Sequence, residues 1–136
     1  MPHFKADLGQ LSRIREFVTE TAAALGVVPT ALDDLRLAVD EAVTNIIVHG
    51  YRGAGEITLD ITADGNDLVV ELRDEAPAFD PTAATTGKPR QPEAHTSPGG
   101  FGLYLIRQSM DEISYRRTSA GNELTMRKRD VVKGVR

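Results

Sequence analysis

The sequence predicts an α+β fold, a two-layer α/β sandwich in which helices cover one face of a mixed, mainly antiparallel sheet. Two observations lead to this class. Helical and alternating hydrophobic periods occupy separate stretches, in the order helix, helix, hairpin, loop, helix, hairpin. The 136 residues are also the length of one domain with one core. We therefore expect residues 1–136 to form a single domain.

The composition excludes several function classes. The chain has no cysteine, which excludes disulfides, thiolate nucleophiles and cysteine-ligated metal sites. Sixteen Lys and Arg against 20 Asp and Glu give a net charge of -4, so we expect no direct contact with nucleic acid. No apolar run is long enough to span a bilayer, and the N-terminus lacks the apolar core of a signal peptide. A cytoplasmic protein with no membrane contact is expected.

Two amphipathic helices open the predicted fold. Apolar residues recur at helical spacing from Leu8 to Leu25, and Gly26 is the expected stop. The second helix has Thr30 as its expected N-cap and runs to about His49.

The hydrophobic period then changes from helical to alternating. Residues 56–62 and 68–73 alternate around an Asp64-Gly65-Asn66 turn signal, which predicts an antiparallel hairpin. A second pair of strands is centred on residues 113–115 and 124–126, with a turn at 119–122. We expect the tail at 130–136 to be frayed.

A long proline-rich segment precedes the third helix. Residues 80–98 hold four prolines and no apolar periodicity, which is typical of a mobile lid or binding loop. A Pro-Gly-Gly-Phe-Gly run at 98–102 follows and opens a helix at about 103–110. Glycines allow backbone amides to approach a ligand closely, and a helix N-terminus attracts phosphate. The run is neither a P-loop nor a dinucleotide fingerprint.

Three polar residues form a row on the second helix. Glu41, Asn45 and His49 follow one another at four-residue spacing along the border of the apolar face, so the row should be partly buried. A half-buried carboxylate beside a carboxamide needs partners. Ligation of a metal and phosphate is one solution. Taken alone, however, the row favours a structural role, in which Glu41 caps a loop, Asn45 bonds to the backbone and His49 caps the helix.

A carboxylate also stands at the end of the second predicted strand. Asp74 begins the run Asp-Glu-Ala-Pro-Ala-Phe at 74–79. Such a group can accept a hydrogen bond from an exocyclic amine of a ligand. Taken alone, an ordinary boundary between strand and turn is the simpler interpretation.

The order of these motifs resembles a known family. A Glu-x-x-x-Asn helix, an Asp at a strand end, a lid-like loop and a Gly-x-Gly helix start resemble the ATP-binding (Bergerat) fold shared by gyrase B, Hsp90, histidine kinases and MutL. The run Gly-Gly-Phe-Gly-Leu-Tyr-Leu-Ile at 99–106 and the Met-Asp-Glu at 110–112 resemble the anti-sigma factor serine kinases of the RsbW and SpoIIAB type. The resemblance extends from the first helix to Arg129.

The resemblance implies a role for each motif. It implies ATP and Mg²⁺ as cofactors, with Glu41 as the general base, Asn45 as the Mg²⁺ ligand and Asp74 as the acceptor from the adenine amino group. It implies an ATP lid at about 80–98. It places the following further residues at the nucleotide: His49, Phe79, Gly99, Gly100, Phe101, Gly102 and Leu103.

One position departs from the family pattern. Ala76 stands two residues after Asp74, where the family usually has a glycine close to adenine, and Glu75 adds a negative charge. We expect this departure to affect nucleotide affinity more than the fold.

The implied function is that of an ATP-dependent protein serine kinase and anti-sigma factor. It would sequester a sigma factor, phosphorylate a serine of a STAS-type anti-sigma factor antagonist, and form a homodimer. Ala76 and the small domain favour an alternative, a nucleotide-gated protein-binding regulator without kinase activity. A histidine kinase catalytic domain acting alone is disfavoured because no helical hairpin with a phospho-acceptor histidine lies upstream.

Overall fold

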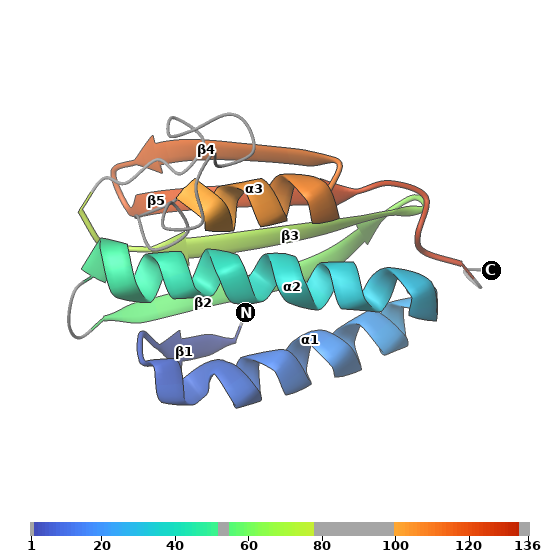
Figure 1. Ribbon diagram of the computed structural model, residues 1–136, viewed down its shortest axis with the longest axis horizontal. Helices are drawn as coiled ribbons and strands as arrows, with labels where there is room; N and C mark the ends of the chain where they lie inside the picture. Colours follow the sequence, from blue (N-terminus) through green and yellow to red (C-terminus); the bar gives the residue numbers. More distant parts are fainter. Residues whose placement is uncertain (1, 52–54, 78–99, 134–136) are drawn as a thin grey trace.

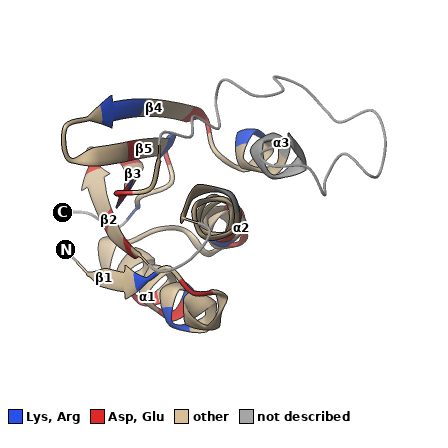
Figure 2. Ribbon diagram, turned by 90° about the vertical axis from the view of Figure 1, so that its left-hand side faces the viewer, with Lys and Arg blue, Asp and Glu red and all other residues tan. Residues whose placement is uncertain are grey.

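The computed structural model describes residues 2–51, 55–77 and 100–133 (Figure 1). The expected lid at 80–98 lies outside these residues, as do Phe79 and Gly99. Three main helices pack on one face of a five-stranded sheet, which Figure 2 shows edge-on. The predicted α+β two-layer class is therefore confirmed.

The sheet contains β1 (His3–Lys5), β2 (Glu56–Asp64), β3 (Asp67–Asp74), β4 (Glu112–Thr118) and β5 (Gly121–Lys128), in the order β1-β2-β3-β5-β4. Every pairing between these described strands is antiparallel, so no parallel component of the expected mixed sheet occurs here. The predicted hairpin is confirmed, because Asp64 pairs with Asp67 and leaves a two-residue turn. The sequence did not predict β1, which at three residues is too short to show alternation.

The helical segments are η1 (Leu8–Gln10), α1 (Leu11–Leu25), α2 (Pro29–Asn45), η2 (Ile46–Tyr51) and α3 (Gly100–Ser109). Gly26 ends α1 in the left-handed region, with φ 86°, as predicted. The expected N-cap at Thr30 is wrong. Val28 is the cap and Pro29 is the first helical residue, where its fixed φ suits the helix and no N–H is needed. The α-helix also ends at Asn45, and the chain continues to Tyr51 as a π-helix.

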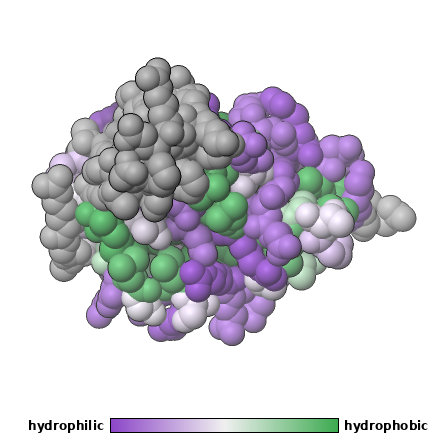
Figure 3. Space-filling model, viewed as in Figure 1, coloured by the Kyte–Doolittle hydropathy of each residue, from purple (hydrophilic) through white to green (hydrophobic). Residues whose placement is uncertain are grey.

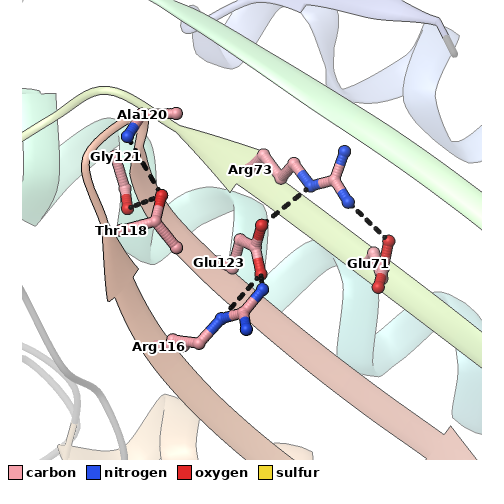
Figure 4. A network of polar contacts seen from close by, with 7 residues as sticks. All are labelled: Glu71, Arg73, Arg116, Thr118, Ala120, Gly121 and Glu123. Carbon is pink, nitrogen blue, oxygen red and sulfur yellow. Dashed lines mark hydrogen bonds and ion pairs between the residues drawn. The ribbon is translucent and has the colours of Figure 1, made fainter.

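The core lies between the helices and the inner face of the sheet. Its largest fully buried side chains come from α1, α2, α3 and the sheet, and include Ile14, Leu35, Val39, Leu59, Leu72, Ile106 and Met126. The outer face of the sheet carries charged residues instead. There Glu123 pairs with Arg73 at 3.3 Å and with Arg116 at 2.6 Å (Figure 4). Such solvent-facing ion pairs contribute little stability, so the burial of apolar side chains on the inner face of the sheet supplies most of the stability of the fold.

Residues 130–133 are ordered, contrary to the expectation of a frayed tail, and residues 134–136 of that prediction lie outside the described residues. Val131 and Val132 are buried, and both their N–H groups donate to the carbonyl of Asn66 at 2.9 Å. The Lys133 N–H donates to the Gly26 carbonyl at 2.8 Å. Residues 130–133 therefore tie the link between α1 and α2 to the β2–β3 turn. Two adjacent valines show no periodicity, which is why the sequence pattern did not reveal this segment.

We expect Gly26→Ala to lower the free energy of unfolding by at least about 1 kcal/mol more than Gly65→Ala does. Both glycines have positive φ, 86° and 62°, so both variants incur the cost of a left-handed alanine. Only at Gly26 would the new Cβ also meet a neighbour, the Lys133 carbonyl oxygen at 2.2 Å, whereas nothing lies within 4 Å at Gly65. Urea denaturation of both variants measures the difference. Equal losses would show that residues 130–133 do not depend on close contact with Gly26.

Candidate functional site

The C-terminal end of α2, the start of α3 and the end of β3 lie at the same end of the molecule (Figure 1). A cavity lined by residues of these elements opens there. Its polar lining comes from Asn45, Asp74, Tyr115 and Asn122. Its other lining residues are Ala42, Ile46, Gly50, Ile106 and Leu124. The fold thus brings two of the predicted site residues, Asn45 and Asp74, to one cavity from separate layers.

Asn45 is the last residue of α2 and is buried, at 8% exposure. Its side-chain Nδ2 has no hydrogen-bond partner among the residues that the structure describes. A purely structural role would have Asn45 bond to the backbone, but its Nδ2 makes no such hydrogen bond within the described part of the chain. A buried amide without a partner costs roughly 1–3 kcal/mol, so its presence in a cavity wall favours a ligand that satisfies it.

Glu41 lies one helical turn before Asn45 on α2 and is half-buried. Burial raises the pKa of its carboxyl group, and the negative charge of neighbouring Asp40 raises it further. A carboxylate with a raised pKa is a better proton acceptor for general base catalysis. Glu41 is not among the described residues that line the cavity, although its neighbour Ala42 is. The backbone of His49 belongs to η2, and its side chain lies outside the described part.

Asp74 closes the opposite side of the cavity, at the end of β3. Its Oδ1 accepts hydrogen bonds from the backbone N–H of Ala76 at 2.9 Å and from Asn122 Nδ2 at 2.8 Å. Burial raises the pKa of Asp74, and these two hydrogen bonds and the charge of Arg117 oppose that rise. Oδ2 receives no hydrogen bond from any described residue. Asp74 is thus both a turn-forming residue and an acceptor available to a ligand.

Asn122 was not predicted as a site residue, because in the sequence it lies in a turn signal. In the structure Asn122 pairs directly across the strands with Asp74 and is 5% exposed. The alternation of the strand did hold a signal for this residue. Asn122 lies two and four residues before the apolar Leu124 and Met126, so its side chain faces the same inner side of the sheet. Its partnership with Asp74 depends on the register between β3 and β5, which the sequence did not show.

Ala76, the departure from the family glycine, is 1% exposed and packs towards Gly50 of η2. A Cβ built on Gly50 would lie 3.3 Å from the Ala76 Cβ, tighter than most such contacts. Ala76 is not among the described cavity-lining residues, whereas Gly50 is. The absence of a side chain at Gly50 therefore leaves room for the methyl group of Ala76 beside the cavity.

The glycine-rich run meets the site only in part. α3, which begins at Gly100, starts at the end of the molecule where α2 finishes (Figure 1). Ile106, further along α3, lines the cavity. Phe101, Gly102 and Leu103 belong to the first turn of α3, with side chains outside the described part. The cavity wall therefore includes α3, while the roles of the run itself stay predictions.

Comparison of the sequence with known proteins identifies the family of this chain. The sequence model of the histidine kinase-like ATPase domain matches residues 4–128. The chain is 31% identical over 114 residues to a serine-protein kinase RsbW of Bacillus pumilus, covering 78% of this chain and 70% of the relative. It is 34% identical over 96 residues to the serine/threonine-protein kinase BtrW of Bordetella bronchiseptica, covering 68% and 66%. The chain belongs to the RsbW-type serine-protein kinases of the histidine kinase-like ATPase family.

Solved structures agree on the fold of this RsbW-type kinase. The RsbU and RsbW domains of Rv1364c from Mycobacterium tuberculosis match with a TM-score of 0.58 at 17% identity, over 95% of this chain and 32% of that chain. The catalytic domain of the histidine kinase ThkA matches with a TM-score of 0.50 at 11% identity, over 96% of this chain and 98% of that chain.

In the described part of the chain, no helix is both long and apolar enough to cross a membrane.

We expect Gly50→Ala to weaken nucleotide binding and Ala76→Gly to restore it. A methyl group on Gly50 would press on the Ala76 methyl at 3.3 Å and so disturb the turn held by Asp74. Calorimetric titration of ATP into each single variant and the double variant measures the coupling. A double variant no better than Gly50→Ala would show that the two positions act independently.

The raised pKa of Asp74 predicts a pH dependence of stability. Because the folded state holds this proton to higher pH than the unfolded chain, the group stabilises the fold below its ordinary pKa of 3.8. That contribution is lost as the pH rises through the folded pKa. The unfolding free energy of the native protein relative to Asp74→Asn should therefore fall as the pH rises above about 4 and then level off. Urea denaturation across this range tests the sign, and a rising difference would contradict it.

Proposed function

We propose that this RsbW-type kinase transfers the γ-phosphoryl group of ATP to a serine hydroxyl of a protein substrate, with Glu41 as the general base and Asn45 as the Mg²⁺ ligand. The observation that carries the proposal is the buried Asn45 Nδ2, a donor without a partner among the described residues that suits a phosphate oxygen and leaves the amide oxygen for Mg²⁺, one turn from a carboxylate of raised pKa and in the same cavity lining as Asp74. The sequence identity to a serine-protein kinase and a serine/threonine-protein kinase supports phosphoryl transfer to a protein hydroxyl group.

The cavity suits a nucleobase at its Asp74 end. Apolar side chains of Ile46, Ile106 and Leu124 supply walls for a flat ring, while Asp74 supplies one oriented acceptor. The exocyclic amino group of adenine is a donor, so it complements this carboxylate. Asp74 is therefore the residue that orients the base in the proposed complex.

The donor set near Asn45 suits Mg²⁺ with phosphates better than a cage made by the protein. No group of three or more His, Cys, Asp or Glu that could hold a metal occurs among the described residues. Mg²⁺ keeps water and phosphate ligands and needs few ligands from the protein, so a single carboxamide fits it. When bound, the ion neutralises charge on the phosphates. The helix start at Gly100 would add backbone N–H groups to the phosphate end.

Glu41 would act on the protein substrate. In the proposed transfer the serine oxygen forms a bond to the γ-phosphorus, the bond from the γ-phosphorus to the bridging oxygen breaks, and ADP leaves. The serine proton passes to the Glu41 carboxylate, whose raised pKa favours that acceptance. Leu37, one turn before Glu41, and Val48 in η2 are exposed at 38% and 43%. Figure 3 views the molecule from its helical side and shows hydrophobic surface there, where a protein substrate can make contact.

The regulatory role follows from the same family relationship. We propose that the protein sequesters a sigma factor and phosphorylates a STAS-type antagonist, and that dephosphorylated antagonist releases the sigma factor. We further propose that it acts in the cytoplasm as a homodimer. The relatives named RsbW support this role.

Glu41→Gln and Asn45→Ala should separate transfer from binding. Glu41→Gln removes the base but keeps its shape, so phosphoryl transfer to the cognate antagonist should fall by roughly 10²-fold or more while ATP affinity changes little. Asn45→Ala should instead abolish the part of ATP binding that depends on Mg²⁺.

Calorimetric titration of ATP with Mg²⁺ and with EDTA measures binding, and transfer of labelled phosphate measures the reaction. Folded native protein that binds no ATP under either condition would contradict the proposed function. Full transfer by Glu41→Gln would contradict the role of Glu41 alone.

A further inference from the structure

A polar network behind Asp74 has no role in the function described so far. It consists of Asn122 on β5 and Tyr115 and Arg117 on β4, together with the backbone of Ala76. Tyr115 and Asn122 line the cavity, and Arg117 is an exposed residue whose guanidinium bonds to Asn122 Oδ1 and to the Ala76 carbonyl. All three side chains lie on the inner face of the sheet, at its cavity end.

The orientation of the Asn122 amide is fixed by hydrogen bonds at both its oxygen and its nitrogen. Oδ1 accepts from the Tyr115 hydroxyl at 2.5 Å and from Arg117 Nη1 at 3.1 Å. A hydroxyl can reverse its role and accept a hydrogen bond, whereas a guanidinium can only donate. Arg117 is therefore the obligate donor on the oxygen side of the amide, while on the other side Nδ2 donates to the carbonyls of Ala76 at 3.1 Å and Pro77 at 3.3 Å, which can only accept. Its Nη1 also donates to the Ala76 carbonyl at 2.7 Å, which holds the segment after Asp74.

The fixed amide then determines what Asp74 presents to the cavity. With Oδ1 facing Arg117, Nδ2 must face Asp74, and it donates to the carboxylate Oδ1 at 2.8 Å. The Ala76 N–H donates to the same oxygen at 2.9 Å. Hydrogen bonds donated to a carboxylate oxygen stabilise its ionised form, so these contacts oppose the rise in the pKa of Asp74 that burial causes. Oδ2 is left to accept from a ligand.

We propose that Arg117, assisted by Tyr115, is a positioning residue that makes Asp74 selective for a nucleobase amino group. Arg117 would act through Asn122, because it is not among the described residues that line the cavity. Adenine offers an N–H donor to the ionised carboxylate. Guanine presents a carbonyl at the corresponding position, which the carboxylate repels. This inference rests on the proposed function, because it assumes that Asp74 binds the base.

Arg117→Met tests the proposal, with Arg116→Met as the matched control. Methionine keeps the apolar stem of Arg117 but removes the donor that holds both Asn122 Oδ1 and the Ala76 carbonyl, so the Asn122 amide and the segment after Asp74 become less firmly held and aim their N–H groups at Asp74 less well. We expect ATP affinity to fall by roughly tenfold and the preference for ATP over GTP to shrink. The rate at saturating ATP should change little, because the loss lies in binding. Arg117→Lys, which keeps a charged donor, should recover part of the affinity.

Arg116 is adjacent on β4, but its side chain lies on the opposite face of the sheet, paired with Glu123 at 2.6 Å (Figure 4). Arg116→Met should therefore leave both nucleotide affinities at the native values. Calorimetry with ATP and GTP gives the affinities, and circular dichroism confirms the fold of each variant.

An Arg117→Met protein with the native ratio of ATP to GTP affinity would overturn the proposal. If that variant does not fold, Tyr115→Phe decides, because it removes one donor and keeps the ring. We expect it to lower ATP affinity by about threefold, and no change would overturn the proposal. Failure of the native protein to bind ATP would instead contradict the proposed function, so the two failures are distinguishable.

Discussion

The hydrogen bond from Asn122 to Asp74 is the interaction on which the rest of the site depends. It joins residues 48 positions apart at the cavity end of two central strands, and the register of β3 with β5 places them directly opposite each other. Burial alone would favour a protonated Asp74. The amide donor opposes that tendency and holds the turn that carries Ala76. The fold therefore supplies both the position and the charge of the carboxylate.

The second side of the cavity depends on a change of helix type. The α-helix ends at Asn45, and the π-helix that follows brings Gly50 against the turn after Asp74. A wider helix is less stable than an α-helix and is frequent at functional sites. Here it places an unpartnered amide and a glycine in the same cavity wall. The small residue at position 50 accounts structurally for the alanine that replaces the usual glycine at 76.

The features that could be predicted from the sequence were those that depend only on residues close together in the chain. Helical spacing placed Glu41 and Asn45 on one partly buried row, and alternation placed Asp74 at a strand end. Asn122 escaped because its role depends on pairing with a strand far away in the chain. The short strand β1 and the valines at 131 and 132 escaped because two or three residues show no period. Thr30 was misassigned because Pro29 can begin a helix without a polar cap.

The two ends of the cavity differ in how far they are satisfied by the protein itself. Asp74 already holds two hydrogen bonds on one oxygen and is oriented before any ligand arrives, whereas Asn45 holds a buried donor without a partner in the described chain. In the proposed function the first end contacts the base, which ATP and ADP share. The second contacts the metal and phosphates, which differ between them. Only interactions that differ between two ligands can discriminate them, so distinction of ATP from ADP must come from the Asn45 end.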